Sequence, residues 1–233
     1  MSEFQLSAIN AAWTIGFDFE DQARSEGFRL IAGVDEVGRG CLAGPVVAAA
    51  CILDPAIPPP EKLNDSKKLT ALQRDRIAGE LRESAIAFAI GSVDADEIDR
   101  INILEATRKA MKLAIESLAD QPDFLLIDAV RLRDVTFPQK AIIKGDSISY
   151  SIAAASVLAK TYRDALMQRY DAEYPHYGFG SHKGYGAAVH LEALRRHGPC
   201  PLHRRSFRGV LPEVGPLDPS PLIGELQPAN QPE

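Results

Sequence analysis

Two apolar runs near the start of the chain, residues 30–34 and 45–53, are rich in Val, Ala and Ile and predict β-strands. The segment between them carries an acidic pair, Asp35 and Glu36, followed by Gly-Arg-Gly at residues 38–40. Glycines so placed indicate a turn, so the runs are predicted to form a hairpin whose first strand ends at the acidic pair. An acidic pair has no use in a hydrophobic core, so the interruption marks either a surface turn or a site.

The remainder of the chain alternates between helical and strand-like patterns. Thr70 and Gln73 have the spacing of a capping box and predict a helix that runs to about residue 83. Asn102 is expected to cap a second helix, and apolar residues at spacings of three and four predict a third over residues 147–170. Further strands are predicted at residues 85–93, 123–128 and 140–146. Strands that alternate with helices after an initial hairpin indicate an α/β fold with a mixed sheet.

The composition is that of an ordinary globular protein, with 233 residues of which 45% are hydrophobic and 25% charged. This length favours one domain. The three cysteines show no CxxC spacing, no apolar run reaches the ~18 residues of a membrane span, and the amino terminus lacks the basic start of a signal peptide. We therefore expect a cytoplasmic protein with no membrane partner.

The formal net charge of -6 argues against indiscriminate binding to nucleic acid. Basic residues nevertheless gather in one carboxy-terminal stretch, where they could contact phosphates: Lys183, Arg195, Arg196, Arg204, Arg205 and Arg208. The histidine spacings fit no helical metal-binding pair, so we expect loop and surface positions for His176, His182, His190, His197 and His203. Residues 212–233 hold six prolines and are predicted to be disordered.

Four carboxylates stand at predicted strand ends: Asp35 and Glu36, then Asp128, and finally Asp146. Strand ends are where α/β sheets usually bind ligands. Like charges at close range repel and raise one another's pKa, so a cation is needed to hold them together. An all-oxygen ligand set suits Mg²⁺ or Mn²⁺, and two such ions about 4 Å apart can promote phosphodiester cleavage. The spacing therefore indicates a possible metal site.

Simpler explanations exist for each carboxylate and for the glycine triplet. Asp128 is also suited to starting a turn and Asp146 to capping a helix, since Asp is favoured at both positions. Neighbouring strand residues face opposite sides, so Asp35 and Glu36 can share an ion only if the strand ends there, which Gly38 would allow. The triplet at 38–40 either lets the backbone approach a sugar-phosphate or is an ordinary turn with a solvated arginine.

Several segments, in this order, resemble the ribonuclease HII family: "GVDEVGRGCLAGPVVAAA", "LNDSKKL", "IDRINILEATRKAM", "LLIDAV", "IIKGDSISYSIAAASVLAKTYRD", "YGFGSHKGYGAAVHLEAL" and "HRRSF". They span roughly residues 30 to 210. The resemblance implies a ribonuclease H-like mixed five-stranded sheet flanked by helices, with a carboxy-terminal helical subdomain. It also implies a catalytic domain at 29–211 whose helical part starts near residue 165, between an amino-terminal extension at 1–28 and the tail at 212–233.

The resemblance further implies an activity. The family's catalytic and metal-binding carboxylates fall on Asp35, Glu36, Asp128 and Asp146, with Mn²⁺ or Mg²⁺ as cofactor and a two-metal mechanism. The expected reaction is hydrolysis of the RNA strand of RNA–DNA hybrids, and cleavage 5′ of single ribonucleotides embedded in duplex DNA. It would leave a 3′-hydroxyl and a 5′-phosphate. The implied role is the removal of ribonucleotides from DNA by a monomeric enzyme.

Residue by residue, the resemblance assigns substrate contacts. The backbone of Gly38, Arg39 and Gly40 is expected to read the 2′-hydroxyl, which alone distinguishes a ribose from a deoxyribose. Tyr185 is expected to pack against the sugar at the RNA-to-DNA junction. Phosphate contacts are expected from Lys67, Lys68, Lys183, Arg204 and Arg205, although basic residues of this kind are more often simply solvated.

The chain departs from the family in one visible place. Cys41 follows the Gly-Arg-Gly triplet where the family usually has proline, so the loop loses a residue that would fix φ. Two other functions stay open, a DNA-processing nuclease on the same fold and a non-catalytic hybrid-binding protein. DNA offers the first no 2′-hydroxyl to read, and the second has no need of four carboxylates, which repel phosphate.

Overall fold

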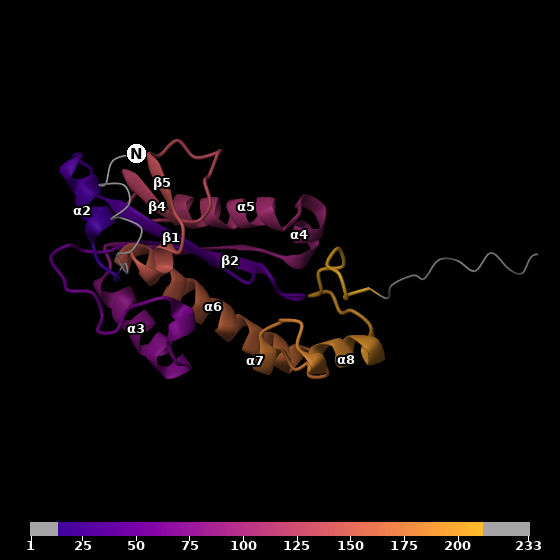
Figure 1. The fold of residues 1–233 in the computed structure, drawn as a ribbon. Helices are drawn as coiled ribbons and strands as arrows, with labels where there is room; N and C mark the ends of the chain where they lie inside the picture. The colour runs from indigo at the N-terminus through magenta and orange to yellow at the C-terminus, as the bar shows by residue number, and fades with distance from the viewer. Residues whose placement is uncertain (1–13, 212–233) are drawn as a thin grey trace, which may run out of the picture.

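A computed structural model describes residues 14–211, which form a five-stranded sheet with helices on both faces (Figure 1). The strand order is β3-β2-β1-β4-β5. β1 pairs antiparallel with β2 and parallel with β4, so the sheet is mixed and the predicted fold class is confirmed. The strands are β1 (Ile31–Val37), β2 (Val46–Ile52), β3 (Ala87–Val93), β4 (Phe124–Asp128) and β5 (Gln139–Ile142).

Helices cover both faces of the sheet, because successive side chains of β2 point to opposite faces and are apolar on each. Ala48 and Ala50 pack into the cluster on the α5 side, whereas Val47 and Ala49 pack toward α3 and α6. Figure 1 shows α4 and α5 on one side of the sheet and α3 and α6 on the other. These helices are α3 (Ala71–Ser84), α4 (Ala95–Ile101), α5 (Ile103–Glu116) and α6 (Tyr150–Glu173).

Two predicted helix starts are confirmed in detail, whereas the helix predicted over residues 147–170 begins at Tyr150, with Ser149 as its N-cap. The Thr70 hydroxyl accepts from the Gln73 amide, and the Gln73 side chain accepts from the Thr70 amide, which completes the capping box. The Asn102 side chain accepts from the amides of Leu104 and Glu105 at the start of α5. The short helix α4, which immediately precedes Asn102, was not predicted.

Two strand boundaries differ from the prediction. β1 does not end at the acidic pair, because its backbone pairing with β2 continues, with Asp35 opposite Ala49 and Glu36 opposite Ala48. Main-chain hydrogen bonds do not require apolar side chains, so acidic residues can sit inside a strand. β5 is shorter than predicted, because Lys144 adopts a left-handed conformation with φ 58° and turns the chain out of the sheet.

The carboxy-terminal part lies beyond one end of the sheet. α7 (Phe179–His182) and α8 (Ala188–His197) follow α6, whose far end they join in a separate apolar cluster around Met167 and Phe179 (Figure 1). The predicted tail at 212–233 lies outside the described residues. Within the part that the structure describes, no helix is long and apolar enough to cross a membrane.

The segment before β1 is ordered into a helix, which the sequence analysis treated only as an extension. Helix α2 (Asp18–Ser25) packs Ala23 into an apolar cluster with Ile31, Leu126 and Ile152. Residues 1–13 lie outside the described part of the chain. Helix α2 therefore packs against the same sheet as the elements that follow it.

The start of α6 lies directly on β1. A Cβ atom at Gly33 would stand 2.0 Å from the carbonyl carbon of Ser151, so only glycine permits this close approach. β1 and α6 are the elements on which three of the predicted site residues depend, since Asp35 and Glu36 lie in β1 and Asp146 just precedes α6. Gly33 therefore fixes the distance between two parts of the candidate site.

We expect Gly33→Ala to destabilise the fold by at least about 3 kcal/mol, because overpacking moves backbone as well as side chains. Gly79→Ala is the matched control, since Gly79 lies within α3 and a Cβ there meets nothing within 4 Å. That control should gain up to about 1 kcal/mol from better helix propensity. Urea denaturation of both variants measures the difference, and equal effects would contradict this account of Gly33.

Candidate active site

The four predicted carboxylates lie on two neighbouring strands and in a short helix that follows a third. Asp35 and Glu36 stand in β1, Asp128 is the last residue of β4, and Asp146 lies in the short 3₁₀ helix η3 (Gly145–Ser147) after β5. Because β1, β4 and β5 run parallel, their carboxyl ends share one edge of the sheet. Asp35 and Asp146 are only 5% and 6% exposed, so these charges are largely withdrawn from water.

The carboxylates interact unfavourably with their surroundings. Burial raises the pKa of Asp35 well above its usual range, and the charges of Glu36 and Asp128 raise it further. Burial is also the main cause that raises the pKa of Glu36, of Asp128 and of Asp146, with nearby carboxylates adding to each shift. A site that disfavours its own negative charges is suited to binding a cation.

Protein groups compensate these charges only in part, and one of them is Arg39, whose Nη1 stands 3.4 Å from Glu36 Oε1. Asp35 Oδ1 accepts from the Glu36 amide at 2.7 Å, and Asp128 Oδ1 accepts from the Gly145 amide at 2.7 Å. Lys67 Nζ stands 3.6 Å from Asp146 Oδ2, on a lysine side chain that is 77% exposed. Glu36 Oε2 is buried and has no hydrogen-bond partner among the described residues. One buried oxygen is therefore left for a ligand.

The donor set fits a hard divalent cation. All four side chains offer oxygen, the ligand type that Mg²⁺ and Mn²⁺ prefer, and Glu36 Oε2 is already desolvated. In residues 14–211, no three Asp, Glu, His or Cys side chains converge closely enough to hold an ion as they stand. Mutual repulsion opposes closer approach, and rotation about χ1 and χ2 is needed to bring the carboxylates into a ligand shell.

The position of Arg204 differs from the one predicted from the sequence. We expected it to contact phosphate, but it is completely buried, and its guanidinium donates to the carbonyls of Gly38, Arg39 and Gly44 at 2.7–3.0 Å. Burial lowers the pKa of Arg204 to about 10, so it stays charged at neutral pH. Its role is to shape the loop at 38–44 from inside, and sequence alone does not distinguish such an arginine from a solvated one.

Arg163 also donates to carbonyls in and next to this loop. This α6 residue is also completely buried and donates to the carbonyls of Pro45, Ala43 and Lys183 at 2.9–3.1 Å. Gly38 has φ 92°, and a Cβ there would stand 2.3 Å from Arg163 Nε, so glycine is required on both counts. Sequence analysis missed Arg163, because its polar side chain lies within an otherwise ordinary helical pattern.

The hydrogen bonds from Arg204 determine where the amide groups of the loop at 38–44 point. In a planar trans peptide, the carbonyl of one residue and the N–H of the next point in opposite directions. Since the carbonyls of Gly38 and Arg39 face Arg204, the N–H groups of Arg39 and Gly40 point away from it. Both residues are exposed, and neither amide donates to another group in the described part of the chain. The loop therefore presents two adjacent donors to solvent.

Tyr185 is held through its backbone by buried histidines. His190 Nδ1 lies 2.8 Å from the Tyr185 carbonyl and must donate to it, which leaves His190 Nε2 to accept from His203 Nε2 at 3.0 Å. His203 Nδ1 then accepts from the Cys200 amide at 3.0 Å. Burial lowers the pKa of His203 to about 4, so the neutral tautomers that this relay needs persist at neutral pH.

The histidine prediction was therefore wrong for two residues. His190 and His203 are 0% and 1% exposed rather than at the surface. The sequence did carry a signal for one of them, because His190 precedes the buried Ala193 and Leu194 by three and four residues, which places it on the buried face of α8.

Cys41 lies against Tyr185. The cysteine is completely buried, and its Sγ stands 3.6 Å from the Lys183 carbonyl. Burial raises the pKa of the Tyr185 hydroxyl, and the neighbouring Cys41 raises it further, while the ring stays 42% exposed. The residue that departs from the family pattern therefore belongs to the loop at 38–44 and lies beside the tyrosine expected to contact the sugar.

The remaining predicted phosphate contacts lie in different settings. Lys67 stands beside Asp146, and Lys68 Nζ donates to Asn64 and Ser147, so both are close to the carboxylates. Lys183 Nζ donates to the Gly180 carbonyl. Arg205 is exposed, and its backbone amide donates to Asp99. Their contacts with phosphate stay predictions.

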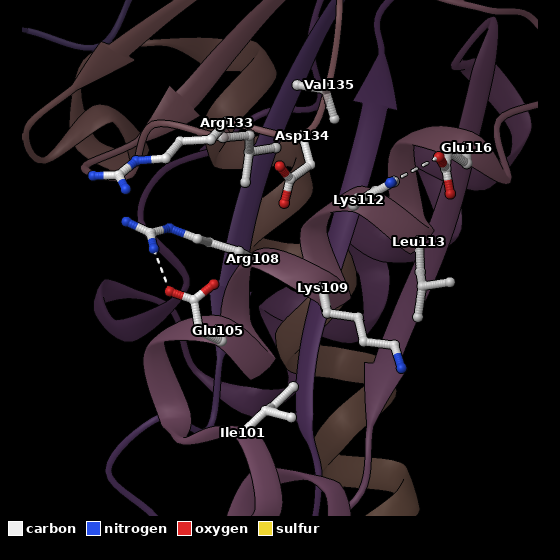
Figure 2. Close-up of a pocket in the computed structure, with 11 residues that line it drawn as sticks. Ile101, Glu105, Arg108, Lys109, Lys112, Leu113, Glu116, Arg133, Asp134 and Val135 are labelled. Carbon is white, nitrogen blue, oxygen red and sulfur yellow. Dashed lines mark hydrogen bonds and ion pairs between the residues drawn. The ribbon is translucent and has the colours of Figure 1, made fainter.

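A groove of about 560 Å³ lies away from these residues, between α5 and residues 132–135 (Figure 2). Its charges largely pair with one another, as Arg108 does with Glu105 and Lys112 with Glu116. None of the predicted site residues lines it.

Comparisons with known proteins agree on one family. The sequence model described as Ribonuclease HII matches residues 32–210. The ribonuclease HII of Syntrophotalea carbinolica is 52% identical over 192 residues, which are 82% of this chain and 91% of that protein. The crystal structure of ribonuclease H2 from Pyrococcus horikoshii OT3 superposes with a TM-score of 0.65 at 26% identity, over 78% of this chain and 95% of that one. A Bst-RNase HIII structure in complex with Mn²⁺ shares the fold, with a TM-score of 0.61 at 21% identity over 81% and 70% of the two chains.

Asp35→Asn should raise the free energy of unfolding at pH 7 in EDTA, because asparagine removes a negative charge that burial and neighbouring carboxylates disfavour. A carboxyl whose folded pKa is raised binds its proton more tightly in the folded state, so wild-type stability falls as pH rises through that pKa. The gain from asparagine should therefore disappear near pH 4. Urea denaturation across pH measures this, and a destabilised variant at pH 7 would contradict it.

Arg204→Lys should destabilise the protein by about 2–4 kcal/mol, because buried carbonyls lose their donors. A lysine ammonium cannot reproduce the planar fork that reaches Gly38, Arg39 and Gly44 together. Arg205→Lys, one residue on and exposed, should stay within about 0.5 kcal/mol of wild type. Guanidinium denaturation gives the free energy of unfolding of both variants. Similar losses in the two would contradict a stabilising role for the hydrogen bonds of Arg204.

Proposed function

The chain belongs to the ribonuclease HII family, whose members are endonucleases of the ribonuclease H class, and we propose that it is a divalent-metal-dependent enzyme acting on ribonucleotides in duplexes. It cleaves the RNA strand of RNA–DNA hybrids and cuts on the 5′ side of single ribonucleotides embedded in duplex DNA. The products carry a 3′-hydroxyl and a 5′-phosphate. The biological role is ribonucleotide excision from DNA, carried out by a monomer in the cytoplasm.

One observation carries this proposal, namely the outward N–H groups of Arg39 and Gly40 in the loop that directly follows the carboxylates of β1. A ribose 2′-hydroxyl can accept from these donors, whereas a deoxyribose offers nothing in that place. Glu36 is only three residues before Arg39. A sugar bound by the loop would therefore lie close to the carboxylates, as selective cleavage beside a ribonucleotide requires.

The carboxylates Asp35, Glu36, Asp128 and Asp146 hold the metal, Mg²⁺ or Mn²⁺, in this proposal. When bound, the ions supply a nucleophile at neutral pH and stabilise the leaving oxygen, in the manner of two-metal phosphodiesterases. The protein's contribution is to hold the carboxylates partly desolvated and near one another, so that a bound cation relieves the charge that burial and repulsion disfavour. The Gly145 amide fixes one oxygen of Asp128, leaving its second oxygen for a ligand.

Tyr185 supplies a ring against the sugar. The tyrosine is 42% exposed, and its backbone is fixed by His190, so the ring has a defined place beside the loop at 38–44. Lys67, Lys68, Lys183 and Arg205 contact phosphates, positioning the duplex without reading its sequence. Arg204 takes no part in phosphate binding and instead orients the peptide groups of the loop.

Neither alternative function is favoured by the site. A DNA-processing nuclease would make no use of the two amide donors, because its substrate lacks the 2′-hydroxyl. A passive hybrid-binding protein would carry four carboxylates that repel the phosphates it must bind.

The proposal is tested with an end-labelled DNA duplex that contains one ribonucleotide, incubated with Mg²⁺ or Mn²⁺. Wild type should make a single cut 5′ of the ribonucleotide and leave an all-DNA duplex intact. Asp128→Asn should lose roughly 10²-fold or more of this activity, because one charged ligand is replaced by a neutral one. Cutting of the all-DNA duplex, or no cut with either metal, would contradict the proposal.

A further inference from the structure

The segment at residues 14–25 precedes the part of the chain matched by the family model, yet it binds the start of α6. Gly16 and Ser149 form a parallel bridge, in which the Gly16 amide donates to Ile148 at 3.2 Å and the Gly16 carbonyl accepts from Tyr150 at 3.1 Å. The rings of Phe17 and Tyr150 pack with their centroids 4.9 Å apart. The segment is therefore fastened to the chain a few residues beyond Asp146.

Glu20 lies at the centre of this contact. The residue is 0% exposed, and its Oε1 accepts from the Ser149 hydroxyl at 2.8 Å and from the Ser151 amide at 2.9 Å. Ser149 is also the N-cap of α6, where its hydroxyl accepts from the Ile152 amide. A carboxylate from another helix thus satisfies donors that the first turn of α6 leaves without intrahelical partners.

The charge on Glu20 has no cationic partner. No ion pair involving Glu20 occurs in the described part of the chain, and its Oε2 is buried without a hydrogen-bond partner. Burying a carboxylate in this way is costly, and a neutral residue would pack here at lower cost. Its compensation comes from the amide and hydroxyl donors and from the positive end of the 24-residue helix α6.

Hydrogen bonds lead from Glu20 to the carboxylate site. The Ser149 amide donates to the Gly145 carbonyl at 2.9 Å, and the Gly145 amide donates to Asp128 Oδ1 at 2.7 Å. Asp146 is the residue next to Gly145 in the same 3₁₀ helix. Movement of Ser149 would therefore displace two of the four carboxylates.

We propose that Glu20 is a positioning residue of the carboxylate site, which it serves by fixing Ser149 and the η3 segment from outside the family-matched region. The inference rests on the proposed function, because it assigns Glu20 to the same metal-binding carboxylates. Through Glu20, the segment before β1 helps to hold the site in place. Glu20 itself touches neither substrate nor metal.

The test compares Glu20→Ala, Glu20→Gln and a control, Asp21→Asn. Glutamine keeps an oxygen that can accept from Ser149 and Ser151, whereas alanine keeps none. Asp21 lies on the same helix, is 67% exposed and pairs only with Arg24 at the surface, so its variant removes the same charge without touching Ser149. Cleavage of the single-ribonucleotide duplex gives kcat and KM for each protein, and calorimetric titration with Mn²⁺ gives metal affinity without any reaction.

Glu20→Ala should lower kcat by roughly 10²-fold and weaken Mn²⁺ binding, with KM changed by less than about twofold, because misplacement of catalytic groups by about 1 Å has effects of this size. Glu20→Gln should recover most of the loss, and Asp21→Asn should match wild type. Unchanged kcat and Mn²⁺ affinity in folded Glu20→Ala would overturn the inference, as would a KM effect alone.

The glutamine variant keeps the inference falsifiable if the alanine variant does not fold, because a Glu20→Gln protein as impaired as a carboxylate variant of the site would contradict simple positioning. Failure of the proposed function would give a different result from failure of the inference about Glu20. In that case wild type itself leaves the duplex intact, while the Mn²⁺ titrations of wild type and Glu20→Gln still report whether Glu20 affects the carboxylates.

Discussion

The withdrawal of four carboxylates from water at one edge of the sheet is the constraint on which the rest of the site depends. Burial is the largest cause of the raised pKa at each of them, so the folded chain holds negative charge where it is least favourable. Such an arrangement persists only if the backbone around it is rigid. The contact of α6 with β1 at Gly33 and the Gly145 amide on Asp128 supply that rigidity.

The loop beside the carboxylates is held in a different way, by buried arginine charges that bind its backbone carbonyls. Arg163 and Arg204 are completely buried, and their hydrogen bonds go to peptide carbonyls of the loop and of Lys183. By drawing carbonyls inward, Arg204 turns the amides of Arg39 and Gly40 outward. Recognition of a sugar hydroxyl by backbone groups thus depends on arginines that the substrate never reaches. Tyr185 is likewise positioned by a residue behind it, since His190 holds its backbone carbonyl.

The sequence predicted what depends on local pattern and on residue type. The hairpin, the capping box at Thr70 and the place of Asp128 at the end of β4 follow from periodicity and composition, and the structure confirms them. Asp146 lies in η3, beyond the end of β5. The sequence-based predictions were wrong where contacts between distant parts of the chain determine the structure. The extension of β1 through Asp35 depends on the partner strand, and the burial of Arg204 depends on carbonyls far away in the chain. The role of the segment around Glu20 was missed for the same reason, since its partners lie about 130 residues later.

The central claim, that these carboxylates form one cation-binding site, is tested most directly by carbon-13 NMR of the carboxyl groups during a pH titration. The spectra would be recorded without divalent ions and with Mg²⁺, and assigned with Asp→Asn variants. The account predicts raised pKa values for Asp35, Asp128 and Asp146 in the metal-free protein, all of which fall when Mg²⁺ is added. Titration curves near the usual range for aspartate, unmoved by Mg²⁺, would contradict it.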